Sequence, residues 1–185
     1  MENTNLELWN KVEKTNPKYT KKPNVKGNNI TSIAPQYQIK NVTEQFGIYG
    51  KTWGFKSLEF DYTLTESLGL VVLHAVFFFP EGEFPVKNAQ NIFIDNAKTK
   101  IDDNFAKKLE TDTLTKAISK LGFNADIFMG LFDDVKYLQQ VTEDYAKEWA
   151  TTENLKNAKA KGFTIEDVKK KYKVRPEQET EFLTL

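Results

Sequence analysis

The run LGLVVLHAVFFF, residues 68–79, is the sequence feature that most limits the folds open to this chain. Read as a strand, the run has apolar side chains on both sides, and such a strand belongs in the middle of a sheet. The run is also far shorter than the ~20 apolar residues that span a bilayer. It therefore predicts a strand in the middle of the sheet.

Two further strands are predicted, one before this run and one after it. Residues 55–64, FKSLEFDYTL, alternate in the way typical of a strand covered on one face. Residues 88–94, NAQNIFI, return as a third strand, and turn-forming residues at 65–69 and 80–83 predict an antiparallel meander. The alternation of the first strand puts Phe55, Ser57, Glu59 and Asp61 on one side and Lys56, Leu58, Phe60, Tyr62 and Leu64 on the other.

A long central helix is predicted after the strands. In DDNFAKKLETDTLTKAISKLG the apolar residues recur at helical spacing. Gly122, the last residue of this stretch, is the residue type that most readily takes the left-handed conformation that ends a helix. We expect the helix to run from about residue 102 to residue 121, with Asp102 or Asp103 as its N-cap.

Flanking helices complete the predicted architecture. Residues 3–15 and 35–46 show helical patterns, the second with Pro35 in its first turn and Gly47 after its last. Residues 126–149 read as a loop followed by a helix. The fold class is therefore α+β: an antiparallel three- to four-stranded β-meander packed against a long central helix, with flanking N- and C-terminal helices.

The composition indicates one domain with two extensions. We expect an N-terminal helix and a flexible basic linker in residues 1–26, a core domain in residues 27–150, and a mobile C-terminal tail in residues 151–185, with one short helix starting at Thr164. The chain has no cysteine, which excludes disulfides and thiolate zinc sites. Its N-terminus lacks a signal-peptide core, so we expect a cytoplasmic protein with no membrane partner.

Charge is balanced over the whole chain but distributed unevenly. The 26 basic residues match the 26 acidic ones, which argues against a uniformly basic nucleic-acid binder. The N-terminal region is basic, through Lys11, Lys14, Lys18, Lys21, Lys22 and Lys26. The region after the central helix is acidic, through Asp126, Asp133, Asp134, Glu143, Asp144 and Glu148. A nucleic acid would therefore have to bind in a local groove.

Two stretches carry a family resemblance. In KKLETDTLTKAISKLGFNADIFMGLFDDVKYLQQV, residues 107–141, the pair Thr111-Asp112 opens a Leu-x-x-Ala-hydrophobic segment that ends in glycine. In IKNVTEQFGIYGKTWGF, residues 39–55, a short helix ending near Phe46-Gly47 is followed by Trp53-Gly54 at the start of the first long strand, where the family has Gly-Trp. Both stretches resemble single-strand annealing proteins of the Rad-fifty-two type and their phage relatives of the Red-beta, Erf and Sak types. The resemblance covers residues 27–141.

The resemblance implies a function in recombination. Such proteins bind single-stranded DNA and anneal complementary strands without ATP, a cofactor or covalent catalysis, and they assemble into rings or filaments of one chain. They commonly act beside an exonuclease and a single-strand-binding protein, which the C-terminal tail would recruit here. The resemblance also implies a phage or prophage source, and hence a bacterial host cytoplasm.

In the family, basic residues on the helix after the Thr-Asp pair face the DNA groove. Lys116 matches one such position, whereas Thr115 and Ser119 stand where relatives often carry further basic residues. Candidate DNA-binding residues are Lys51, Lys56, Lys98, Lys100, Lys107, Lys108, Lys116 and Lys120. An ordinary solvated helix face is the alternative interpretation of these lysines. Tyr49, Phe55 and Tyr62 are candidates for base stacking, or else core or subunit contacts.

Other chemistry is poorly supported. GIYGKTWG lacks the Gly-x4-Gly-Lys spacing of a nucleotide loop, and Trp53 in it is expected beneath the sheet. His74 is the single histidine of the chain, so neither a catalytic triad nor a zinc site is expected. Asp133 and Asp134, with Asp126 nearby, fit a metal site less well than helix N-caps.

A function of a different class is kept open. The chain is also compatible with a protein-interaction or inhibitor module that uses the same scaffold and binds a host or phage protein through its acidic face. The balanced net charge and the neutral residues Thr115 and Ser119 favour this alternative.

Overall fold

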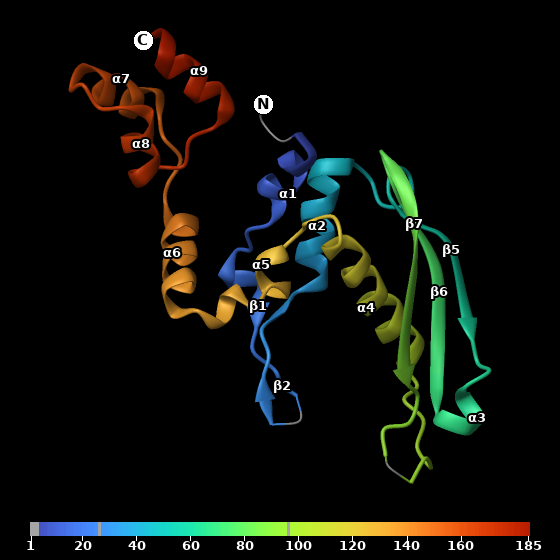
Figure 1. The fold of residues 1–185 in the computed structure, drawn as a ribbon. Coiled ribbons are helices and arrows are strands. Elements are labelled where there is room, and N and C mark those ends of the chain that lie inside the picture. Colours follow the sequence, from blue (N-terminus) through green and yellow to red (C-terminus); the bar gives the residue numbers. More distant parts are fainter. Residues whose placement is uncertain (1–3, 26, 96) are drawn as a thin grey trace. The chain divides into compact units, whose positions relative to one another are not determined.

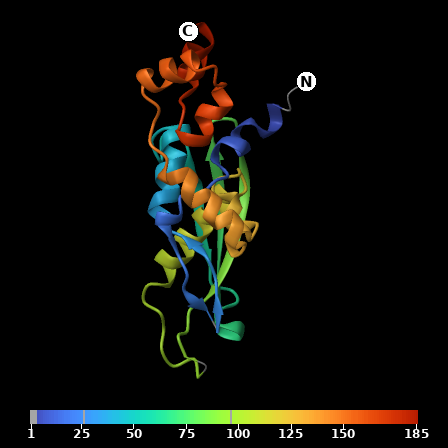
Figure 2. The same cartoon turned by 90° about the vertical axis from the view of Figure 1, so that its left-hand side faces the viewer.

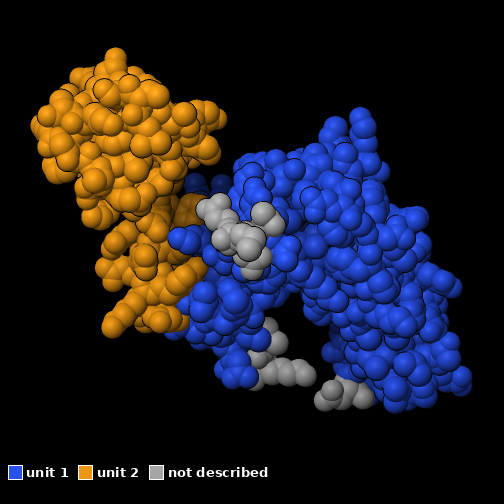
Figure 3. Space-filling view, turned by 45° about the horizontal axis from the view of Figure 1, so that its top comes forward, with its two compact units in different colours: residues 1–133 blue, residues 134–185 orange. Residues whose placement is uncertain are grey.

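The computed structural model describes residues 4–25, 27–95 and 97–185 and divides into two compact units, residues 1–133 and residues 134–185 (Figures 1 and 3). The first residue of the predicted N-terminal helix and Lys26 of the predicted basic linker lie outside the described residues. The boundary between the two units lies just before α6 (Val135–Ala146), whereas we expected the core domain to continue to residue 150.

The first unit is built around a three-stranded antiparallel sheet in the order β5 (Gly54–Asp61), β6 (Leu70–Phe79), β7 (Gly82–Asn91). The apolar run forms β6, which is the central strand as predicted. A short helix, α3 (Thr65–Leu68), connects β5 to β6, and a two-residue turn connects β6 to β7, since Phe79 pairs with Gly82. The α+β class and the antiparallel meander are confirmed.

The third strand starts six residues earlier than the sequence predicts. We expected it at 88–94, because residues 80–83 read as a turn, but β7 begins at Gly82. Pro85 lies on β7, which is an edge strand, and is paired with Val76 of β6. A proline is tolerated there because an edge strand leaves part of its backbone hydrogen-bonding capacity unused.

A bulge in β5 changes which side chains face the core. The pairing shifts between Phe55, opposite Phe77, and Ser57, opposite Val76. The extra residue brings Phe55 onto the same face as Phe60, which lies opposite Leu73. The predicted strict alternation, which placed Phe55 and Phe60 on opposite sides, was therefore wrong.

Two helices pack on one side of this sheet, α2 (Pro35–Phe46) and α4 (Phe105–Ser119) (Figure 1). They surround the fully buried Trp53, whose indole nitrogen donates to the Gly47 carbonyl at 2.8 Å, so its predicted burial is confirmed. The main core consists of Val12, Val42, Trp53, Phe77, Val86, Leu114, Ala117, Ile118 and Phe123. A second cluster consists of Val71, Leu73, Ile92 and Leu109.

The central helix is shorter than expected at its start. Asn104 is its N-cap residue, in place of Asp102 or Asp103. The Asp102 carboxylate instead accepts hydrogen bonds from the Asn104 backbone N–H at 3.1 Å and from the Lys108 ammonium at 2.6 Å. Asp102 therefore lies in the loop before the helix and hydrogen-bonds to the start of the helix without being its N-cap.

The N-terminal region is more ordered than the flexible linker that we predicted. It contains η1 (Thr4–Leu6), α1 (Glu7–Val12) and η2 (Pro17–Tyr19), then the strand pairs β1 (Thr20–Lys21) with β4 (Ser32–Ile33) and β2 (Asn24–Val25) with β3 (Asn28–Asn29). The pairs form a narrow ribbon leading into α2 (Figures 1 and 2). The Asn24 side chain accepts from the backbone N–H of Gly27, whose φ is 89°, which closes the ribbon's turn.

A buried polar network ties the N-terminal region to α5 (Ala125–Phe128). The Asp126 carboxylate, 1% exposed, accepts from the Thr15 backbone N–H at 2.7 Å and from the Thr15 hydroxyl at 2.6 Å. The Asn124 amide donates to the same hydroxyl at 3.0 Å. Because buried polar groups must be paired, this network fixes α1 against the end of the central helix.

The second unit is helical throughout most of its length. It contains α6, α7 (Thr152–Ala160), α8 (Ile165–Lys171) and α9 (Pro176–Thr184), and Ala150, Leu155, Val168 and Phe182 form a core of its own. We expected a mobile tail with one short helix. Capping boxes at Thr151 and Thr164 start α7 and α8, and the helix from Thr164 is the one that we predicted.

The network at Asp126 makes a stability prediction. Asp126→Asn should lower the free energy of unfolding by about 1–3 kcal/mol, because at least one buried donor of Thr15 loses its charged acceptor. Asp133→Asn, at an exposed position seven residues later, serves as the matched control and should change it by less than about 0.5 kcal/mol. Urea unfolding followed by circular dichroism measures both, and equal midpoints would contradict the structural role of Asp126.

Gly122 makes a second stability prediction. Its φ is 94°, and a Cβ atom placed there would lie 2.7 Å from two ring carbons of Trp9. Gly130 also has a positive φ, 74°, but open space around it, so its replacement by alanine measures the cost of the backbone conformation without a clash. Gly130→Ala should cost roughly 1–2 kcal/mol, and Gly122→Ala about 1–3 kcal/mol more because of the clash. Thermal unfolding that ranks the two variants equally would show that Trp9 does not pack on Gly122.

Candidate nucleic-acid interface

A groove runs along the outward face of α4 in the first unit. Its volume is about 660 Å³. We call it the α4 groove, and it is lined by Ile30, Thr31, Ser32, Ile33, Pro35, Lys107, Lys108, Thr111, Asp112, Thr115, Ile127 and Phe128. Three regions far apart in the sequence, the ribbon, α4 and α5, thus contribute to one surface.

The groove combines cations, hydroxyl groups and half-exposed apolar side chains. Ile30 and Phe128 are each 49% exposed. The Thr111 hydroxyl donates to the Lys107 carbonyl at 2.8 Å, and the Thr115 hydroxyl donates to the Thr111 carbonyl at 3.0 Å. These bonds explain how two threonines are accommodated inside a helix, and they leave the hydroxyl oxygens able to accept a further hydrogen bond.

Lys107 and Lys108 supply the positive charge of the α4 groove. The Lys108 ammonium lies 2.6 Å from the Asp102 carboxylate, and this hydrogen bond is the largest cause that holds the pKa of Asp102 below its usual range. Among the described residues, no carboxylate forms an ion pair with Lys107. Lys107 is therefore the cation of the groove that is most available to a ligand.

Lys116 belongs to a network beside the groove. Its ammonium lies 2.8 Å from the Asp112 carboxylate and donates to the side-chain Oδ1 of Asn88 at 3.0 Å, while the side-chain Nδ2 of Asn88 donates to Asp112 at 2.8 Å. Asp112 lines the groove, whereas Lys116 does not. The network joins α4 to β7 and compensates the charge of the lysine that matches the family pattern.

The remaining predicted lysines lie away from the α4 groove. Lys120 lies over the Phe84 ring at 5.7 Å, and Lys56 forms an ion pair with Glu83 at 2.8 Å. Lys98 donates to the Ser67 carbonyl at 3.3 Å. Lys51 and Lys100 are exposed in the loops that precede β5 and α4. The structure thus brings together two of the eight candidates and separates the others.

The predicted stacking residues are also separated. Phe55 packs against the main core, and Tyr62, 54% exposed, packs edge-on against Phe105. Tyr49 lines a smaller hollow of about 210 Å³ together with Gln38, Glu110, Thr111 and Thr115, so it lies next to the groove. Burial, and secondarily the charge of Glu110, raise the pKa of Tyr49. Tyr49 is therefore the predicted aromatic residue nearest to the groove.

The sequence prediction did not include Ile30, Thr115 and Phe128 among the candidate site residues, although all three line the α4 groove. Ile30 and Phe128 read as ordinary apolar residues, and Thr115 was noted for the basic residue it lacks. The unusual threonine inside the helix was the available signal, because a weak helix former needs another reason for its position.

The acidic residues considered for a metal site serve the fold. The Asp126 carboxylate accepts a hydrogen bond from the Thr15 backbone N–H. Asp134 is the N-cap of α6, and its carboxylate accepts from the backbone N–H groups of Lys136 and Tyr137. The N-cap prediction is thereby confirmed for Asp134. The described parts of the chain contain no cluster of three His, Cys, Asp or Glu side chains placed to hold a metal ion.

Comparison with known proteins adds no relative. No protein-family model matches the sequence, and no curated protein matches it significantly. Within the ranges that the structure describes, no helix combines the length and the apolar character needed to cross a bilayer.

The pair of Asp102 and Lys108 makes a pH prediction. The pKa of Asp102 is depressed in the folded state, so the pair contributes stability above the unfolded pKa of about 4, and this contribution is lost as the pH falls through the folded pKa. Acid should therefore destabilise the wild type more steeply than Asp102→Asn between about pH 5 and pH 3. Lys108→Gln should flatten the same profile, and the double variant should add nothing. Parallel profiles of wild type and variants would contradict the pairing.

Proposed function

We propose that this chain binds single-stranded DNA and anneals complementary strands without ATP, as a recombination protein of the single-strand annealing class. The α4 groove is the observation that carries the proposal. It places Lys107, Lys108 and the Thr-Asp pair of the family-like motif on one surface with the half-exposed Phe128. Both stretches that resemble the family contribute to the unit that contains this groove.

Each part of the groove has a role in such a reaction. The ammonium groups of Lys107 and Lys108 neutralise phosphates, which releases counterions and gives binding without regard to sequence. Phe128 and Ile30 offer apolar surface to bases. A strand held extended by its phosphates presents its bases to a complement, and pairing itself supplies the driving force. No covalent step is required.

The modest charge of one groove supports action as a homo-oligomer. Asp112 lies in the groove with the two lysines, so a single copy attracts DNA weakly. A ring or filament repeats the groove along one strand, and effective concentration then raises the overall affinity. The open face of the sheet, where Val72, Val76 and Phe78 of β6 are only half-buried, offers apolar surface for contact between copies.

The proposal extends to location and partners. The protein would act in the cytoplasm of a bacterial host, beside an exonuclease or a single-strand-binding protein recruited through residues 151–185. Pull-down of such a partner by the full chain and by a chain lacking these residues tests the recruitment. Equal capture by both chains would exclude it.

A protein-interaction or inhibitor module is the second candidate function. Carboxylates already compensate Lys108 and Lys116 in the structure, which favours a surface that does not need DNA. This candidate predicts no DNA binding at any salt concentration and capture of a protein partner through the acidic residues.

The decisive test measures binding of a fluorescent single-stranded oligonucleotide across a salt series. The double variant Lys107→Gln/Lys108→Gln should weaken binding at 100 mM salt by about tenfold or more. The salt slope, which is the fall of the logarithm of the binding constant with the logarithm of the salt concentration, should decrease by about 1.4, since each phosphate contact contributes ~0.7. Lys120→Gln, beyond the end of the same helix and outside the groove, is the matched control and should bind like the wild type. A wild type that ignores DNA at 20 mM salt would overturn the annealing function and favour the second candidate.

A further inference from the structure

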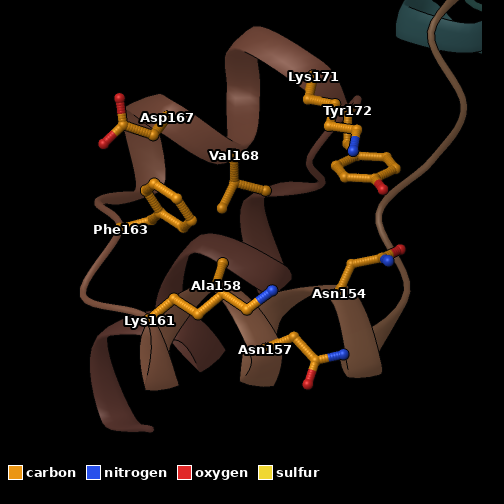
Figure 4. Close-up of a pocket in the computed structure, with 9 residues that line it drawn as sticks. All are labelled: Asn154, Asn157, Ala158, Lys161, Phe163, Asp167, Val168, Lys171 and Tyr172. Carbon is orange, nitrogen blue, oxygen red and sulfur yellow. The ribbon is translucent and has the colours of Figure 1, made fainter.

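The second unit contains a hollow of its own between α7 and α8 (Figure 4). Its volume is about 400 Å³, within the range of small-molecule sites, ~300–1,000 Å³. Figure 4 shows Phe163 and Tyr172 at opposite ends of the hollow, with Ala158 and Val168 between them. Phe163 is 53% exposed and Val168 is 5% exposed. The hollow therefore has an apolar floor and one aromatic ring accessible to solvent.

Two lysines with uncommitted charge border this hollow. Within the described ranges, neither Lys161 nor Lys171 forms an ion pair with a carboxylate, although the Lys171 ammonium lies 5.5 Å from the Tyr172 ring centroid. The neighbouring Lys169, in contrast, pairs with Glu166 and Glu179. The hollow thus combines aromatic surface with two available cations.

The local charge favours an anionic ligand. Residues 151–173 contain seven lysines and three acidic residues, although the whole chain is neutral. One of these acids, Asp167, lines the hollow, but its carboxylate accepts from the Lys170 ammonium at 2.8 Å and from the Thr164 hydroxyl at 2.7 Å. Those bonds hold the pKa of Asp167 well below its usual range, and Lys170 compensates the charge.

We propose that this hollow binds one nucleotide of single-stranded DNA, as a second DNA contact separate from the α4 groove. The base stacks on Phe163 over the floor of Ala158 and Val168, and the flanking phosphates meet Lys161 and Lys171. The inference rests on the proposed function, because it assigns the same ligand to a second site.

A nucleotide fits the hollow better than a peptide does. Two common modes of peptide binding add a strand to an open sheet edge or lay a helix in a long groove. The described part of the second unit has no sheet, and the hollow is confined to the space between two short helices. Nucleotides, in contrast, bind one at a time through a ring face and phosphates, and the hollow provides partners for both.

Photo-crosslinking of the full chain tests the site directly. An oligonucleotide carrying 5-iododeoxyuridine, which crosslinks to stacked aromatic rings, should attach to Phe163. The crosslink should persist in Lys107→Gln/Lys108→Gln at low salt and disappear in Phe163→Ala. Circular dichroism verifies that Phe163→Ala keeps its helical content. Crosslinks confined to residues 1–133 would overturn the inference and leave the annealing function standing.

The salt series provides an independent measurement. Lys161→Gln/Lys171→Gln should reduce the salt slope by about 1.4, whereas the matched control Lys136→Gln/Lys156→Gln, two exposed lysines outside the hollow, should leave it unchanged. An unchanged slope in the first variant would overturn the inference. Binding of a Glu-rich peptide with one Phe at this hollow, without any DNA crosslink there, would also overturn it and identify a protein-docking site. A wild type that binds no DNA would remove the annealing function and this inference together.

Discussion

The packing of α4 against the central strand of the sheet is the interaction on which the rest of the first unit depends. Leu109, Ala117 and Ile118 are buried on the side of α4 that faces the sheet, and α2 closes over the same core. Because the buried side of this helix is fixed by packing, the backbone on the side that lines the α4 groove is fixed as well. A groove built on such a helix keeps the backbone positions of its lysines and threonines fixed, which lowers the conformational cost of binding an extended ligand.

The sequence predicts the parts of this fold that have strong periodicity. The central strand, the long helix and the burial of Trp53 all follow from patterns that extend over many residues. The bulge at Lys56 and the early start of β7 depend on pairing with a neighbouring strand, which no local pattern records. The helices from Thr151 and Pro176 are short, so their capping residues are weak signals beside a polar composition. For the site, the sequence showed many lysines but not which of them a carboxylate already holds.

The balanced charge of the chain becomes, in the structure, a set of local ion pairs. Lys108 and Lys116 each have a carboxylate within 3 Å, and such partly exposed pairs have small net energies. A phosphate can therefore replace the carboxylate at little cost, but the displaced Asp102 or Asp112 then remains as a nearby negative charge. In the proposed function, this competition would limit the affinity of a single copy and favour rapid release.

The buried network of Thr15, Asn124 and Asp126 joins positions that are 109 and 111 residues apart in the chain. During synthesis at about 5–20 residues per second, α1 emerges from the ribosome roughly 5 to 20 seconds before its polar partners exist. Until then Thr15 lacks Asp126 and Trp9 lacks the backbone at Gly122, and the nascent segment must remain soluble by its charged residues. The lysines and glutamates of the N-terminal region thus serve the growing chain as well as the finished protein.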